Sequence, residues 1–210
     1  MLSVLVLLTG LTVWFRPAAR ERRRIGATKM YKAADLPEVT VGRLIGTARA
    51  IDGKTITSPV SGKPCLVYSV IVSANVTRKD VEVIFEETVG VRFALEDDTG
   101  SVIVEPERAN CTLGRERQPM KMFPTLSDLS ASQRELLARH GTSHPRQNIY
   151  RWQEGIVEAG ETIAVVGFGQ RGPDGVMTMS SSPRLPLTIS DHRATTKTNA
   201  PEIPDARVVK

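Results

Sequence analysis

The 210-residue sequence has few of the side chains that bind metals or act as nucleophiles, since it contains only two cysteines, Cys65 and Cys111, and three histidines. A structural zinc site needs four ligands, which usually come as two close pairs, and the sequence has no Cys-x-x-Cys pair. We therefore expect no metal and no other cofactor. A disulfide between the two cysteines stays open at this point, although a cytoplasmic location would disfavour it.

Aromatic residues are also scarce, at 5%, and the basic charge is confined to one end of the chain. The net charge is +5, but residues 1–32 hold seven basic side chains and one acidic, whereas the remaining residues hold 21 basic and 22 acidic ones. The part that folds is thus close to neutral. A face that binds nucleic acid would carry positive charge on the folded domain and aromatic rings for stacking. We therefore expect no nucleic-acid partner.

One uncharged apolar segment is present, MLSVLVLLTGLTVWF at residues 1–15. As a helix it would span about 22 Å of a hydrocarbon core roughly 30 Å thick, and Arg16 could reach the interface by snorkelling. A retained transmembrane anchor is the favoured interpretation, with a cleaved signal peptide and a core helix as alternatives. A signal peptide begins with basic residues, whereas here the arginines follow the apolar run. Because basic residues stay on the cytoplasmic side, we expect a single-pass membrane protein with its N-terminus outside and its domain in the cytoplasm.

A basic juxtamembrane linker is expected at residues 16–37. The candidates for contact with membrane lipids are Arg16, Arg20, Arg22, Arg23 and Arg24. Each cation near an anionic surface contributes about 1 kcal/mol of attraction. Orientation of the anchor during insertion explains the cluster equally well, and we favour that simpler interpretation.

The most regular part of the sequence is VRFALEDDTGSVIVE at residues 91–105. Apolar and polar residues alternate before and after Asp97-Asp98-Thr99-Gly100, which is typical of two half-buried strands joined by a turn. Similar short alternating runs recur up to residue 190. One segment differs: residues 125–141 predict a helix, with Ser130 and Gln133 as a capping box and Gly141 as its stop.

These patterns predict a mainly β fold, in which an N-terminal transmembrane helix precedes an antiparallel OB-like barrel, or a sandwich, with one inserted helix. The β domain is expected at residues 38–190. Residues 191–210 are polar and contain two prolines, so we expect a disordered tail.

Several segments resemble the GIDE or BAM ("beside a membrane") domain of the mitochondrial ubiquitin ligase activators and their plant and bacterial relatives. The matching pieces are residues 42–50, SPVSGKPC (58–65), LEDDTGSVIVEP (95–106), YRWQEGIVEAGETIAVVG (150–167) and PLTIS (186–190). The resemblance implies a domain at a bilayer surface, and in the eukaryotic members a second membrane helix and a C-terminal RING finger that recruits a ubiquitin-charged conjugating enzyme. This sequence has no second apolar span and too few cysteines for a RING, so we expect no ligase activity of its own. The resemblance supplies no catalytic residue.

Four residues are the candidates for chemistry. Asp97 and Asp98 could bind a divalent cation or act as an acid and base pair, but acidic residues at this place are more typical of a turn. Cys65 could be a nucleophile if a base lay near it, and otherwise it is a small buried hydrophobic residue. Cys111, near Arg108 and Arg115, is the thiol that we expect to be more exposed.

Three weaker patterns favour ordinary structure. His140 and His144 have the spacing of a helical metal pair, but Gly141 and Pro145 interrupt the helix. The string GFGQRG at residues 167–172 follows a strand, as in a dinucleotide site, but leads into a Pro-Asp-Gly turn rather than a helix. The cations Arg115, Arg117 and Lys121, with Phe123, could contact single-stranded nucleic acid, which the neutral domain argues against.

The leading hypothesis is a membrane-anchored, non-enzymatic β module that binds or scaffolds another, unidentified protein at the membrane surface. Its alternatives are a relative of the RING-type ubiquitin ligases, a thiol-dependent enzyme acting through Cys65 or Cys111, and an OB-type protein that binds single-stranded nucleic acid.

Overall fold

The computed structural model describes residues 17–75, 81–114, 121–123, 126–141 and 150–197. The helical elements are α2 (Pro17–Ala27), α3 (Ala131–Arg139) and the 3-10 turns η1 (Ala33–Asp35), η2 (Ile51–Gly53) and η4 (Leu126–Asp128). The strands are β1 (Thr40–Ala50), β2 (Ile56–Thr57), β3 (Pro64–Cys65), β4 (Val67–Asn75), β5 (Val81–Gly90), β6 (Phe93–Asp97), β7 (Gly100–Val104), β8 (Asn110–Thr112), β9 (Lys121–Phe123), β10 (Tyr150–Val157), β11 (Thr162–Arg171), β12 (Met177–Ser180) and β13 (Thr188–Ser190).

The predicted anchor at residues 1–15 lies outside the described residues. Among the helices that the structure does describe, none is both long and apolar enough to cross a membrane.

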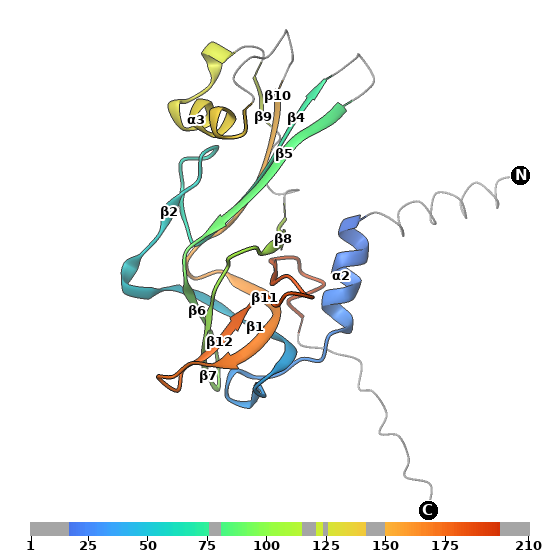
Figure 1. Ribbon diagram of the computed structural model, residues 1–210, viewed down its shortest axis with the longest axis vertical. Helices are drawn as coiled ribbons and strands as arrows, with labels where there is room; N and C mark the ends of the chain where they lie inside the picture. Colours follow the sequence, from blue (N-terminus) through green and yellow to red (C-terminus); the bar gives the residue numbers. More distant parts are fainter. Residues whose placement is uncertain (1–16, 76–80, 115–120, 124–125, 142–149, 198–210) are drawn as a thin grey trace, which may run out of the picture.

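A closed barrel of five strands forms one half of the fold (Figure 1). Its strands follow the order β1-β6-β7-β12-β11, and pairing of β11 with β1 closes the ring. The chain leaves the barrel after β1 to form β2 to β5, returns as β6 and β7, leaves again through β8, β9, α3 and β10, and returns as β11 and β12. The mainly β prediction is thus confirmed.

The barrel was predicted to be antiparallel, but one neighbouring pair in the ring is parallel, since β12 runs parallel to β7. Outside the ring, β13 also runs parallel to β8. Parallel neighbours need a long crossover between them. The chain from β8 through β10 supplies that crossover. The alternation of apolar and polar residues is a local pattern and does not predict such a long connection.

Inward-facing residues of the barrel form its core. The fully buried members include Leu44, Phe93, Leu95, Val102, Val104, Ile163, Val165, Met179, Leu187 and Ile189. The hairpin predicted at residues 91–105 is confirmed as β6 and β7, with Asp97 paired to Gly100 across the turn. Alternation therefore identified which side chains of this hairpin enter the core.

A second sheet, in the order β5-β4-β10-β9, extends away from the barrel and carries α3 near its far end (Figure 1). The helix packs Leu136 and Leu137, and the chain just before it packs Leu129, against Tyr68, Val70, Val72 and Trp152 of the sheet. The predicted capping box is confirmed, since Ser130 Oγ accepts from Gln133 N at 3.2 Å and Gln133 Oε1 accepts from Ser130 N at 2.9 Å. The sequence predicted this helix but not the separate sheet that it covers.

Residues 16–37, interpreted above as a basic linker, contain a helix that is docked on the barrel. Ile25 of α2 is 1% exposed and packs against Ala164 and Val166 of β11. The buried Arg43 of β1 donates from Nη1 to the Ile25 carbonyl at 3.4 Å, close to the C-terminal end of α2. A cation at that end of a helix meets carbonyl groups that have no partner inside the helix. The segment is therefore part of the folded domain.

Residues 191–197, predicted above as the start of a disordered tail, belong to the folded domain. Asp191 and Thr195 are buried, and Thr195 Oγ1 donates to Ser190 Oγ at 2.9 Å. These contacts hold residues 191–197 on the barrel, and residues 198–210 lie outside the described residues.

Candidate functional site

Asp97 and Asp98 are separated by their hydrogen bonds rather than joined in a site. Asp97 Oδ1 accepts from Thr99 N at 2.8 Å and Thr99 Oγ1 at 2.6 Å, while its Oδ2 accepts from Ala33 N at 2.9 Å. Asp98 instead forms an ion pair with Lys32. The two carboxylates thus close the β6–β7 turn and attach η1 to it.

The pKa of Asp97 lies below its usual value. Partial burial opposes ionisation, but hydrogen bonds from Thr99 and Ala33 and the charge of Lys32 outweigh that burial. A carboxylate held by these donors is a structural acceptor, not an acid or base poised near neutral pH.

Cys65 is fully buried in the cluster beneath α3. Burial, together with the charges of Glu154 and Glu158, raises its pKa to about 12, and Sγ donates to the Ile56 carbonyl at 3.6 Å. A nucleophilic cysteine requires the opposite conditions, namely a lowered pKa and access to substrate. The structure therefore gives Cys65 the surroundings of a buried hydrophobic residue.

Cys111 lies in β8, partly buried against the barrel core, and both cysteines are thiols. Because Cys65 belongs to the cluster of the second sheet, the two sulfurs are held by different cores. They do not fit a shared zinc site of the RING type.

His140 takes part in a contact between α3 and β5. Its Nε2 lies 2.7 Å from Glu87 Oε2, and its ring stacks on Phe85 with centroids 4.0 Å apart. The same carboxylate accepts from Tyr68 OH at 3.0 Å. His144 lies outside the described residues, so the proposed histidine pair is not tested.

The glycines of GFGQRG belong to strand structure. Gly167 and Gly169 lie within β11, and Gly172 N donates to the Val176 carbonyl at 2.8 Å in the turn that leads to β12. This is a hairpin between two barrel strands. Of the cations considered for nucleic acid, Arg115 and Arg117 lie outside the described residues, and Lys121 is in β9.

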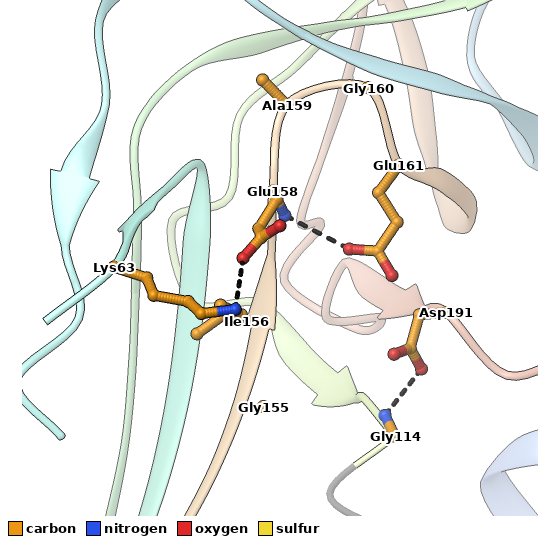
Figure 2. Close-up of a pocket in the computed structure, with 9 residues that line it drawn as sticks. All are labelled: Lys63, Gly114, Gly155, Ile156, Glu158, Ala159, Gly160, Glu161 and Asp191. Carbon is orange, nitrogen blue, oxygen red and sulfur yellow. Dashed lines mark hydrogen bonds and ion pairs between the residues drawn. The ribbon is translucent and has the colours of Figure 1, made fainter. Parts of the chain in front are cut away.

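A pocket of about 440 Å³ lies where the barrel meets the second sheet (Figure 2). Four segments line it: the end of β10 with the β10–β11 turn, the loop before β3, the residues after β8 and the residue after β13. The lining residues are Lys63, Gly114, Gly155, Ile156, Glu158, Ala159, Gly160, Glu161 and Asp191. None of the polar ones was among the candidates from the sequence.

Carboxylates outnumber cations in this pocket. Three carboxylates line it, those of Glu158, Glu161 and Asp191, beside one ammonium group, that of Lys63, which lies 3.1 Å from Glu158 Oε1. Glu158 N donates to Glu161 Oε2 at 3.2 Å, and Gly114 N donates to Asp191 Oδ1 at 2.6 Å. Figure 2 shows these pairs around one hollow. The pocket therefore has an acidic character.

The acidic turn is fixed to the barrel by backbone hydrogen bonds. Gly160 N donates to the Ala48 carbonyl at 2.8 Å, and Ala48 N donates to the Glu161 carbonyl at 2.9 Å. Gly160 has a φ of +90°, which favours glycine. The carboxylates of Glu158 and Glu161 are thus carried on a rigid support.

The opposite wall depends on the buried side chain of Glu154. Its Oε1 accepts from Ser58 Oγ and, at 3.2 Å, from Val60 N. These bonds hold the loop at residues 58–63, which carries Lys63 to the pocket. In the described part of the chain, no group of three or more His, Cys, Asp or Glu side chains could hold a metal ion.

Comparison with protein families gives one match: the family model GIDE, described as an E3 ubiquitin ligase, covers residues 72–196. The chain belongs to the GIDE family. No curated protein and no solved structure matches it.

The GIDE match covers only part of the pocket. Glu158, Glu161 and Asp191 lie inside the matched residues, whereas Lys63, Cys65 and α2 precede them. In the sequence, the acidic turn appeared only as part of the YRWQEGIVEAGETIAVVG segment, which carries the family resemblance. Nothing in the sequence indicated that Asp191 joins it, because β13 brings that residue from a distant position.

Proposed function

We propose that this GIDE domain is a non-enzymatic protein-binding module held at a membrane surface, and that its acidic pocket receives a basic segment of the partner protein. The observation that carries the proposal is the group of three carboxylates, Glu158, Glu161 and Asp191, around a hollow at the junction of the two sheets. We also infer that the barrel is OB-like, which its five-stranded closed form supports.

The chemistry of the pocket supports a peptide ligand. Glycine lines it at Gly114, Gly155 and Gly160. The space that a Cβ atom would take is filled by Leu113 at Gly155 and by the Asp191 carboxylate at Gly114, but it is open at Gly160. Ligand backbone can therefore approach closely at the β10–β11 turn. Excess negative charge in a concave site attracts lysine and arginine side chains and repels acidic ones. Binding of this kind needs no nucleophile, in keeping with the surroundings of Cys65.

The membrane part of the proposal rests on residues 1–15 and the arginines that follow them. The lipid-facing set is smaller than the sequence suggested, because Arg24 is turned toward the barrel. Its Nη2 donates to Thr188 Oγ1 at 2.6 Å and lies 2.5 Å from Glu21 Oε1. Arg16, Arg20, Arg22 and Arg23 remain proposed to contact lipid. A single span with the N-terminus outside and the domain in the cytoplasm also remains a proposal.

A peptide-binding measurement tests the pocket. Full-length protein in mild detergent is titrated against fluorescein-labelled tetralysine and tetraglutamate peptides with blocked ends. We expect the cationic peptide to bind and the anionic one not to bind. The double variant Glu158→Gln/Glu161→Gln should weaken tetralysine binding by tenfold or more.

The matched control is Glu82→Gln/Glu135→Gln, which removes the same charge at exposed positions of β5 and α3. It should change the Kd by less than twofold. Equal binding of both peptides, or equal losses in the two double variants, would show that the pocket is not the binding site.

A second candidate function is participation in ubiquitin transfer, which the family's description favours. The buried Cys65, with its pKa near 12, opposes a thioester intermediate on that residue. The domain would then act by binding a conjugating enzyme or its target. A reconstituted transfer assay tests this: stimulation that persists in Cys65→Ser and disappears in Glu158→Gln/Glu161→Gln supports a binding role.

A further inference from the structure

Val39 has an unfavourable backbone conformation and no burial to compensate for it. Its φ is +56°, in the left-handed region that glycine and asparagine tolerate and β-branched residues avoid. Its side chain is 74% exposed. Neither the fold nor the core therefore requires valine here, and such strain is characteristic of residues with a role outside the fold.

Two more exposed valines lie at the same end of the barrel. Val41 is 39% exposed and Val176 is 40% exposed. Arg171 joins their segments, since its Nε donates to Glu38 Oε1 at 2.8 Å and its Nη1 donates to the Gly175 carbonyl at 2.7 Å. The residues directly before Val39 and Val176 are thus tied together. We call Val39, Val41 and Val176 the valine patch.

This patch continues the side of the barrel that α2 covers. Val41 pairs with Phe168, and two residues along the strands Arg43 pairs with Val166. Residues two apart on a strand face the same side of the sheet, about 7 Å from each other. Val166 is buried under Ile25 of α2. The basic helix and the valine patch therefore lie next to each other on one side of β1 and β11.

The charge around the patch has both signs, with an excess of cations on α2. Beside the valines, Glu38 pairs with Arg171, and the exposed Asp174 accepts from Val176 N at 3.1 Å. α2 carries four arginines and one acid, Glu21, which pairs with Arg24. Lys29, two residues after the helix, is exposed. Apolar side chains flanked by cations are the combination that binds an anionic lipid surface. A second copy of the chain would instead bring two sets of the same cations together, which disfavours this side as a dimer interface.

We propose that this side of the barrel lies on an anionic bilayer, with the valine patch in the interfacial region and the cations of α2 over the lipid headgroups. The proposal rests on the membrane part of the proposed function and adds the orientation of the domain. The acidic pocket is carried on the same rigid barrel, at the turn clamped to Ala48 near the other end of β1. Valine at position 39 thus contributes contact with lipid, although its backbone conformation is unfavourable for valine.

Depth-dependent fluorescence quenching tests the orientation in the full-length protein. The Val39→Cys/Cys111→Ser variant is labelled with the NBD fluorophore and reconstituted in vesicles of phosphatidylcholine and phosphatidylserine. Cys65 is buried with a pKa near 12 and stays unlabelled. The matched control is Ser132→Cys/Cys111→Ser, with the label on the exposed surface of α3.

We expect the label at position 39 to shift to the blue and to be quenched by lipids brominated in their acyl chains, and the label at position 132 to do neither. Val176→Asn should reduce the quenching at position 39. If the protein sediments with the vesicles while both labels stay in water, this orientation is overturned and the membrane location stands. If the protein does not sediment with the vesicles, the membrane location and the orientation both fall.

Discussion

Gly46 of β1 lies directly against the backbone of Glu96 in β6: a Cβ atom at position 46 would come within 2.4 Å of the Glu96 carbonyl oxygen. This is the corner at which β1 changes partners. Thr47, the next residue, pairs with Thr162 of β11 and also with Glu96. The barrel closes only if the two strands approach this closely.

The substitution Gly46→Ala should therefore destabilise the fold strongly. The new methyl group meets backbone atoms, which cannot rotate away as a side chain can, so we expect a loss of about 3 kcal/mol in the free energy of unfolding. Denaturant titration followed by tryptophan fluorescence measures it. Gly26→Ala in α2 is the control, because a Cβ there meets nothing within 4 Å. It should stabilise the protein by about 0.5–1 kcal/mol, and a loss at Gly26 as large as at Gly46 would contradict this account.

The Asp97 carboxylate should make the protein sensitive to acid. Its folded-state pKa is lowered, so the charged form is favoured in the folded protein. The resulting stability is present above the unfolded-state pKa of about 3.9 and is lost as the pH falls through the folded-state pKa. Asp97→Asn removes this titration, and its amide cannot accept from both Thr99 and Ala33 N. We expect the variant to lose about 1–3 kcal/mol in the free energy of unfolding at pH 7. Between pH 5 and pH 3, its free energy of unfolding should fall less than that of the unmodified protein.

Urea unfolding at pH 7, 5 and 3 measures both effects. Asp98→Asn is the control for the neighbouring position, since its ion pair with Lys32 is exposed and its loss should leave the urea midpoint almost unchanged. If the free energy of unfolding depends on pH equally in the unmodified protein and in both variants, then Asp97 is not the source of the acid sensitivity.

Local rules identified the parts of the fold that depend on neighbours in the sequence. Alternation located the β6–β7 hairpin, and the Ser130 and Gln133 capping box located the start of α3. The same alternation could not assign a strand to a sheet. β4 and β10 both look like barrel strands, but they pair with each other across more than 70 residues and extend beyond the barrel.

Three features could not be predicted because they depend on contacts between residues that are distant in the sequence. α2 docks through Ile25, and one buried position leaves no apolar period in a helix rich in arginine. The parallel pairing of β7 with β12 depends on where the chain returns. The pocket depends on Asp191 and the Glu158–Glu161 turn, which meet only in the folded protein, whereas the cysteine and aspartate candidates were chosen for their reactivity in other proteins.

Cys65 should resist alkylation while the protein is folded. Burial raises the pKa of Cys65 to about 12, so the sulfur is in the thiol form at pH 7, and it is also inaccessible to reagent. Iodoacetamide followed by peptide mass spectrometry should modify the partly exposed Cys111 first and Cys65 only after unfolding in urea. Rapid modification of Cys65 in the folded protein would reopen the thiol-enzyme hypothesis.

The strain at Val39 predicts a substitution that stabilises the protein. Glycine adopts a φ near +56° without steric cost, and the exposed valine side chain contributes no burial, so Val39→Gly should raise the free energy of unfolding by about 1 kcal/mol. Val41→Gly is the control within β1. Its side chain is also exposed but its backbone is that of a strand, where glycine costs about 0.5–1 kcal/mol.

Thermal unfolding of the three proteins, without lipid, measures this difference, and the vesicle experiment measures what the valine provides. We expect Val39→Gly to unfold at a higher temperature, Val41→Gly at a lower one, and both to reduce the contact of this side of the barrel with lipid. If the two variants change stability in opposite directions but both reduce lipid contact, then the valine at position 39 acts in lipid contact and not in folding. A lower unfolding temperature for Val39→Gly would show that valine at this position supports the fold after all.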